Sequence, residues 1–324
     1  MPTDRAVLAA AICVIASLAA PDAGAQAFPT KPVRYVMPLP GGSETDIFAR
    51  VLAKHLSDYW NQPVVVENRP GAGTTIGSDL VAKAPPDGHT LLHAITAHGV
   101  NPTLRSRMPY DTLKDFACVT HIGNLYGILA VHPSLPVRNL KEFIALAKRA
   151  PGEVQYATGG AGTANHIAAE AIRLAAKIDI QHVPYKGSSL AVLDVLPGRV
   201  PVLATVLVEA KPYIDSNKLR VIATTSPKRA PSLPDTPTVT ETLPSYRVGA
   251  SFWAIVTRAG TPAPAIAKLN ADARKGMASA DARKRFQIAD VEYVGSSPSA
   301  CDAFLRDQVA TWGAIVKATG ASVN

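Results

Sequence analysis

The sequence has few cysteines, few aromatic residues and little charge for its length. Of its 324 residues, only 3 are Cys, 6% are aromatic and 18% are charged. Three cysteines are too few for a small disulfide-stapled scaffold, and a hydrophobic content of 47% is too high for a disordered chain. We therefore expect a globular protein whose stability comes from its hydrophobic cores.

Motifs of common enzyme and nucleotide-binding chemistry are also missing. There is no G-x-S-x-G nucleophile elbow, no glycine loop ending in G-K-[ST] and no H-E-x-x-H zinc motif. The glycines of residues 71–77 follow the spacing G-x-G-x-x-x-G, which favours a turn over a dinucleotide fingerprint. His89, His93 and His98 lack the helical spacing of zinc ligands. We expect a protein without catalytic residues, metal or cofactor.

The amino terminus has the three parts of a secretory signal peptide. Arg5 precedes an apolar run over residues 6–20, and residues 25–27 form an A-x-A cleavage site. This run of 15 residues is shorter than the roughly 20 that a helix needs to cross a bilayer. We therefore expect a signal peptide that ends at Ala27 and a mature, periplasmic protein that starts at Phe28.

The mature chain is long enough for two medium-sized domains and carries a net positive charge. Loss of residues 1–27 leaves 297 residues and removes two Asp and one Arg, so the net charge rises from +8 to +9. The basic residues are scattered along the chain, and an exported protein seldom meets nucleic acid. The charge therefore indicates either an ordinary solvated surface or attraction of an anionic ligand, and no nucleic-acid partner.

Two cysteines, Cys118 and Cys301, remain after cleavage. They can form one disulfide in an oxidising compartment, or they can be small buried residues with free thiols. The sequence does not decide between these states, and we expect the cysteines to be unpaired.

Strand and helix patterns alternate along most of the mature chain. Continuous apolar strands followed by amphipathic helices are typical of an α/β fold with mostly parallel sheets. We predict strands at 33–39, 63–67, 90–95, 126–132, 154–158, 180–185, 219–225 and 250–257, and helices at 47–59, 139–149, 164–177, 188–196, 263–279, 281–289 and 299–318.

Two connectors, at residues 132–136 and 243–246, interrupt this alternation. If the chain leaves one domain at the first connector and returns at the second, the middle segment is an inserted lobe. We predict one lobe from residues 28–133 plus 248–324 and a second from residues 134–247. Two crossings make a hinge, with the ligand between the lobes.

Two glycine-rich loops each follow a predicted strand and open a predicted helix. The first, residues 38–46, reads PLPGGSETD, and the second, residues 157–166, reads ATGGAGTANH. Helix N-termini present free backbone N–H groups and a partial positive charge, which suits an anion. Thr45 or Asp46 can cap the first helix, and His166 is placed to orient the second loop. The alternative for each loop is a plain turn with a helix cap.

Many motifs of the mature chain resemble those of the Bug family, the periplasmic receptors of tripartite tricarboxylate transporters. They are colinear with the family pattern over essentially all of residues 28–324. They occupy residues 28–34, 66–73, 75–77, 86–92, 101–102, 109–111, 114–116, 131–136, 157–166, 183–187, 218–226, 233–239 and 259–264.

The resemblance implies a type II periplasmic-binding-protein fold that closes on a small organic carboxylate. It implies no cofactor, a monomer, and the transporter's membrane subunits as partners. The ligand would be held by backbone N–H groups, hydroxyls and waters of the two loops, with Asp46 capping its helix and Asp194 orienting the second loop. The ligand-binding residues so implied are Gly41, Gly42, Ser43, Asp46, Thr158, Gly160, Gly162, Thr163 and Asp194.

Three departures from the family pattern concern the pocket. Glu44 intrudes into the first loop, Pro201 replaces an acidic residue, and residues 206–209 are bulkier than the usual small, polar run. They predict a reshaped pocket, suited to an apolar or aromatic carboxylate or to an amino acid. A ligand sensor for a signalling kinase would use the same pocket, and a periplasmic hydrolase is a further alternative.

Overall fold

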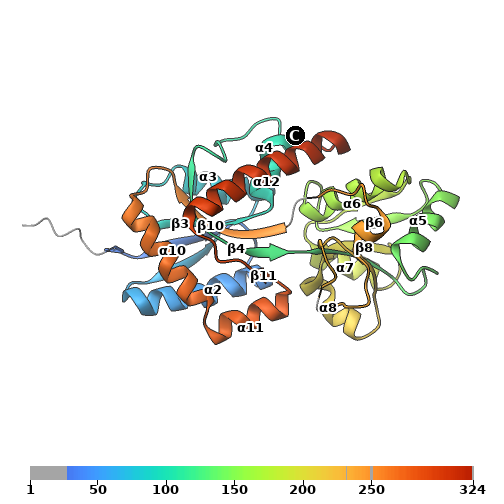
Figure 1. The fold of residues 1–324 in the computed structure, drawn as a ribbon, viewed down its shortest axis with the longest axis horizontal. Coiled ribbons are helices and arrows are strands. Elements are labelled where there is room, and N and C mark those ends of the chain that lie inside the picture. Colours follow the sequence, from blue (N-terminus) through green and yellow to red (C-terminus); the bar gives the residue numbers. More distant parts are fainter. Residues whose placement is uncertain (1–27, 231, 249–250, 323–324) are drawn as a thin grey trace, which may run out of the picture.

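Two β-sheets, each covered by helices on both faces, make up the molecule (Figure 1). The computed structural model describes residues 28–230, 232–248 and 251–322. The predicted α/β fold with two sheets is confirmed, whereas the predicted signal peptide lies outside the described residues. None of the helices in the described part of the chain combines the length and the apolar run that a membrane span requires.

The first sheet has six strands in the order β11-β4-β10-β3-β1-β2. Figure 1 shows α2, α10 and α11 on one side of this sheet and α3, α4 and α12 on the other. Its strands are β1 (Val33–Met37), β2 (Val64–Asn68), β3 (Thr90–Ile95), β4 (Phe116–Leu125), β10 (Ser251–Arg258) and β11 (Glu292–Tyr293). Its helices are α2 (Glu44–Trp60), η1 (Ala72–Thr74), α3 (Thr75–Ala82), α4 (Ala97–Leu104), α10 (Ala263–Met277), α11 (Ala280–Ala289) and α12 (Pro298–Thr319).

The second sheet has five strands in the order β7-β6-β8-β5-β9. Helices α5, α6 and α9 contribute to the core on one face, and α7 and α8 to the core on the other. Its strands are β5 (Gly127–Val131), β6 (Gln155–Thr158), β7 (Gln181–Pro184), β8 (Val202–Val206) and β9 (Arg220–Thr224). Its helices are α5 (Leu140–Arg149), α6 (Ala164–Ala176), α7 (Ser188–Val195), α8 (Leu207–Asp215) and α9 (Val239–Thr242).

Local sequence accounts for these elements. The burial pattern of β1 is nearly continuous, as expected for a strand that pairs on both edges and has helices on both faces. Helix α5 starts at the N-cap Asn139, whose side chain accepts a hydrogen bond from the Glu142 amide, and ends with Lys148 and Arg149 in its last turn.

The chain crosses between the sheets within a single residue, Tyr126, because β4 ends at Leu125 and β5 starts at Gly127. Strand β5 pairs with β8 and β9 of the second sheet. The change of sheet falls seven residues before the lobe boundary expected after Pro133, and the division into lobes stays a prediction. An apolar strand directly continues another, so no Pro-rich connector marks the change of sheet.

The chain returns to the first sheet between β9 and β10, and the strand directions follow from these two crossings. Strands β5 and β10 each begin where the chain enters their sheet, so each runs antiparallel to its βαβ neighbours β8 and β3. The carboxyl ends of β1 and β6 consequently lie at the side of each sheet where the chain crosses. The loops after β1 and β6 are the two predicted glycine loops.

Cys118 and Cys301 form a disulfide, with their Cα atoms 5.7 Å apart. The expectation of unpaired thiols was therefore wrong. The bond ties β4 to the first turn of α12 and joins residues 183 positions apart in the sequence. Because only the packing of α12 on β4 brings the two cysteines together, their spacing in the sequence carried no signal.

Candidate ligand-binding site

The first glycine loop ends at a well-formed helix cap. Ser43 has extended backbone angles, and its hydroxyl accepts a hydrogen bond from the Asp46 amide at 3.2 Å. Ser43 is thus the N-cap of α2, and the prediction of Thr45 or Asp46 as the cap is corrected. An extended residue with a short hydroxyl side chain fits this position better than a residue already inside the helix.

Asp46 lies in the first turn of α2, at the end of this loop, and is only 2% exposed. Its carboxylate accepts hydrogen bonds from the Gly42 amide at 3.0 Å, from Arg50 Nε at 3.0 Å and from Asn68 Nδ2 at 2.8 Å. Burial alone would raise the pKa of Asp46, but the hydrogen bonds from Arg50, Gly42 and Asn68 outweigh it and lower the pKa. Asp46 therefore shapes the loop as an ionised carboxylate.

Several amides of the first loop remain available to a ligand. Gly41 and Gly42 are exposed, and Gly42 has a φ of +89°, which a residue with a side chain rarely adopts. Although the Gly42 amide is used by Asp46, those of Gly41, Ser43 and Thr45 donate no hydrogen bond to any described residue. The side chain of Glu44, whose effect on the pocket the sequence raised, lies outside the described part of the structure.

The second glycine loop, residues 157–166, is organised in the same way. Thr163 is the N-cap of α6: its hydroxyl accepts from the His166 amide at 3.3 Å and donates to the Gly160 carbonyl at 2.9 Å. Thr158 is fully buried, and its hydroxyl bonds with the Gly160 amide and with His182 Nε2 at 2.7 Å. Both predicted hydroxyls are thus engaged within the protein, and the loop offers a ligand mainly backbone groups.

Two histidines lie beneath this loop. His166 Nδ1 accepts a hydrogen bond from the Gly162 amide at 3.1 Å, and its ring stacks on that of His182 with centroids 3.9 Å apart. Burial lowers the pKa of His166, and burial together with the nearby His166 lowers that of His182 to about 4. Both rings are therefore neutral at neutral pH, as the acceptor role of Nδ1 requires. His166 was expected to orient the loop, whereas the role of His182 was missed.

Asp194 contacts the second loop indirectly, through Tyr185. Its carboxylate accepts from the Tyr185 hydroxyl at 2.8 Å and from Arg199 Nη1 at 2.8 Å. The Tyr185 amide in turn donates to the Thr158 carbonyl at 3.1 Å. Asp194 therefore holds the residue that aligns the start of the loop, as expected of a residue that orients it.

The second loop lies where the two sheets meet. Ala164, the first residue of α6, packs against a cluster that contains Val100 of α4 and Trp312 of α12. Val206 and Val208 of the second sheet pack against the same core of the first sheet as Leu39, which leads into the first loop. Contacts between the two lobes' elements thus lie next to the start of α6 and next to the residue that leads into the first loop.

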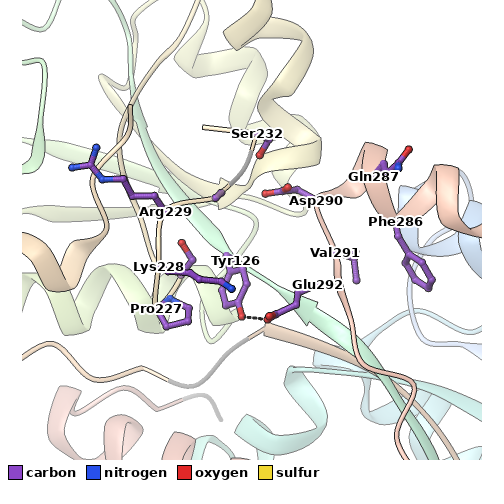
Figure 2. Close-up of a pocket in the computed structure, with 12 residues that line it drawn as sticks. Tyr126, Pro227, Lys228, Arg229, Ser232, Phe286, Gln287, Asp290, Val291 and Glu292 are labelled. Atoms are coloured by element: carbon purple, nitrogen blue, oxygen red, sulfur yellow. Dashed lines mark hydrogen bonds between the residues drawn. The ribbon is translucent and has the colours of Figure 1, made fainter. Parts of the chain in front are cut away.

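A separate cavity of about 560 Å³ lies beside the crossing (Figure 2). Its walls come from both sheets: Tyr126 and Lys228 on one side, and Phe286, Asp290 and Glu292 on the other. The Tyr126 hydroxyl donates to the Glu292 carboxylate across its floor. None of the predicted site residues lines this cavity, and the strand order places β9 and β11 at sheet edges away from β1 and β6. Sequence reasoning missed its residues, which share no motif.

Known proteins resemble this chain along nearly its whole length. The family model described as "Tripartite tricarboxylate transporter family receptor" matches residues 48–321. Protein BugT of Bordetella pertussis is 34% identical over 310 residues, covering 95% of this chain and 95% of BugT. The solved structure of "R. palustris Rpa4515 with adipate" is 30% identical, with a TM-score of 0.83 over 91% of this chain and 99% of that one. MatC (Rpa3494) from Rhodopseudomonas palustris with bound malate is 27% identical, with a TM-score of 0.80 over 89% of this chain and 100% of that one.

Proposed function

Because the chain belongs to the family of tripartite tricarboxylate transporter receptors, we propose that it is an extracytoplasmic solute-binding protein that captures a small organic carboxylate between two lobes. Each lobe contains one of the two sheets and contributes one glycine loop. The captured carboxylate is delivered to the membrane subunits of a transporter.

One observation carries this proposal: two helices, α2 and α6, begin next to contacts between the sheets with backbone amides that have no acceptor among the described residues. A carboxylate supplies such acceptors, and the partial positive charge of both helix N-termini favours it. The names of two structural neighbours give adipate and malate as their bound ligands, and both are carboxylates.

Capture requires the lobes to move. The chain passes between the sheets at Tyr126 and again between β9 and β10, and two such crossings form a hinge. The cavity beside the first crossing leaves room for the lobes to rotate, and the Tyr126–Glu292 hydrogen bond lies on the hinge itself. Ligand binding then favours the closed form because only that form brings both loops to the ligand.

Export places the receptor in the periplasm. The sequence of residues 1–27 supports cleavage after Ala27. The mature protein then works as a monomer that meets its transporter at the outer faces of both lobes.

Proline substitutions at the first residue of each helix test the role of the amides. Proline at this position removes one N–H and is compatible with the helix, and the extended N-caps Ser43 and Thr163 suit a residue before proline. We expect Glu44→Pro and Ala164→Pro each to weaken carboxylate binding by about 10- to 100-fold, the value of one charge-assisted hydrogen bond. Isothermal titration calorimetry with succinate, malate, adipate and L-glutamate measures this loss.

Two controls separate the amide from other effects. Glu44→Ala removes the side chain but keeps the amide. Ala280→Pro makes the same change at the start of α11, whose N-cap Ser279 has the same extended geometry. Ala280→Pro should bind like the wild type, and Glu44→Ala at least as tightly as the wild type, because it removes a negative charge at the start of α2. Unchanged affinity in Glu44→Pro and Ala164→Pro would exclude the loops as the carboxylate site.

A further inference from the structure

Glu209 is a carboxylate next to the carboxyl end of β8 that the proposed carboxylate site does not use. It lies in the first turn of α8, and its side chain is exposed to solvent. The hydroxyl of Thr205, a fully buried residue of β8, donates a hydrogen bond to Glu209 Oε2. This bond turns the Glu209 side chain back toward the carboxyl end of β8.

That position borders the second glycine loop. The Ser188 side chain at the start of α7 also faces the Glu209 carboxyl. Ser188 in turn lies so close to the loop that a Cβ atom on Gly159 would come within 2.6 Å of its hydroxyl. Val206 and Val208, on either side of the turn into α8, pack against the core of the first sheet. Glu209 is therefore at the place where the second loop meets the other lobe.

No cation in the described part of the chain neutralises this carboxylate. Among the described residues, no Lys, Arg or His forms an ion pair with Glu209. Other carboxylates near the loops have such partners: Asp46 pairs with Arg50, and Asp194 pairs with Arg199. The N-terminus of α8 accommodates a negative charge but supplies no counter-ion.

The surroundings of Glu209 also destabilise its ionised form when no counter-ion is present. Burial raises the pKa of its carboxyl, which means that the ionised form has lost part of its hydration. A positive group placed next to this carboxylate would stabilise its ionised form.

We propose that Glu209 binds a positively charged group of the ligand itself, so that the receptor selects carboxylates that also carry an ammonium group, such as amino acids. This inference rests on the proposed function, since the glycine loops hold the ligand's carboxylate. A plain dicarboxylate would bring a second negative charge toward Glu209 and bind less well. The chain would then differ in ligand class from the neighbours named with adipate and malate.

Ligand pairs that differ only by an ammonium group test this selection. L-glutamate is compared with glutarate, and L-leucine with 4-methylpentanoate, by calorimetry on the wild-type mature protein. We expect the amino member of at least one pair to bind at least about 10-fold more tightly, because a charged partner is gained. In Glu209→Gln this preference should fall to about 1-fold to 2-fold, through weaker binding of the amino member.

Glu153→Gln is the matched control, since it removes the same charge from an exposed residue of the same lobe before β6. It should keep the wild-type preference. Equal affinities within both pairs in the wild type overturn the inference without any variant, and so does a preference that survives Glu209→Gln. If the wild type binds none of the four compounds nor malate or adipate, the proposed function fails, and the inference fails with it.

Discussion

Replacement of Asp46 by alanine tests whether this buried carboxylate organises the first glycine loop. The substitution removes the acceptor of hydrogen bonds from Gly42, Arg50 and Asn68. Hydrogen bonds to a charged group contribute about 1.5–3 kcal/mol each, but they are not additive. Arg50 has a half-exposed side chain and Gly42 is exposed, so both can bind water instead. We therefore expect the free energy of unfolding to fall by about 2–4 kcal/mol.

Urea unfolding followed by circular dichroism measures this loss, and the melting temperature should fall by about 4–8 °C for a chain of this size. Asp58→Asn is the matched control on the same helix, because Asp58 forms an exposed i,i+4 ion pair with Lys54. Such a pair contributes only about 0.3–0.5 kcal/mol.

The pH dependence gives an independent check. Because the folded-state pKa of Asp46 is lowered, its stabilisation is complete above the ordinary Asp pKa of about 3.9 and is lost as pH falls through the lowered value. The difference between wild type and Asp46→Ala should therefore be larger at pH 7 than at pH 3. A cost no greater than that of Asp58→Asn, or a difference that does not change with pH, would refute the role given to Asp46.

Three further predictions concern the disulfide, the second loop and export. Reduction of Cys118–Cys301 should lower the free energy of unfolding by about 2–5 kcal/mol, and thiol titration of the denatured, non-reduced mature protein should find no free thiol; two free thiols would contradict the bond. Thr158→Val should cost about 1–3 kcal/mol, because it leaves the half-buried His182 and the Gly160 amide without this partner; an unchanged urea midpoint would show that these bonds do not matter. Mass spectrometry of the secreted protein should give a chain that starts at Phe28, and an intact residue 1–27 segment would rule out the predicted cleavage.

Long, strongly patterned elements were predictable from the sequence. Strand β3 occupies the predicted residues 90–95, and α12 extends from residue 298 to 319 against a predicted 299–318. Elements with contrary local signals were missed. Helices α4 and α8 contain Pro102 and Pro212, which ordinarily argue against a helix.

Strands β4 and β8 were also missed, and β4 carries the crossing between the sheets. Strand β8 is a five-residue apolar run directly after a proline. This pattern fits a short buried strand, and the sequence reading overlooked it. The disulfide and the Thr158–His182 hydrogen bond join residues of different elements. The lack of an ion pair at Glu209 also depends on how different elements pack. Such tertiary relations leave no periodic trace in one sequence.

The two glycine loops were predictable as helix-opening turns after strands, and the structure has both. Which atoms they offer was not predictable. The hydroxyls of Thr158 and Thr163 bond within the loop, and Asp46 takes the Gly42 amide. What is left for a ligand is the set of first-turn amides, because a helix cannot satisfy these groups internally.

A crystal structure of the mature protein with a bound carboxylate tests the central claim most directly. The account predicts carboxylate oxygens at about 2.7–3.2 Å from backbone nitrogens at the starts of both α2 and α6. A carboxylate bound instead in the cavity between Tyr126, Lys228 and Asp290, with both loops empty, would contradict it.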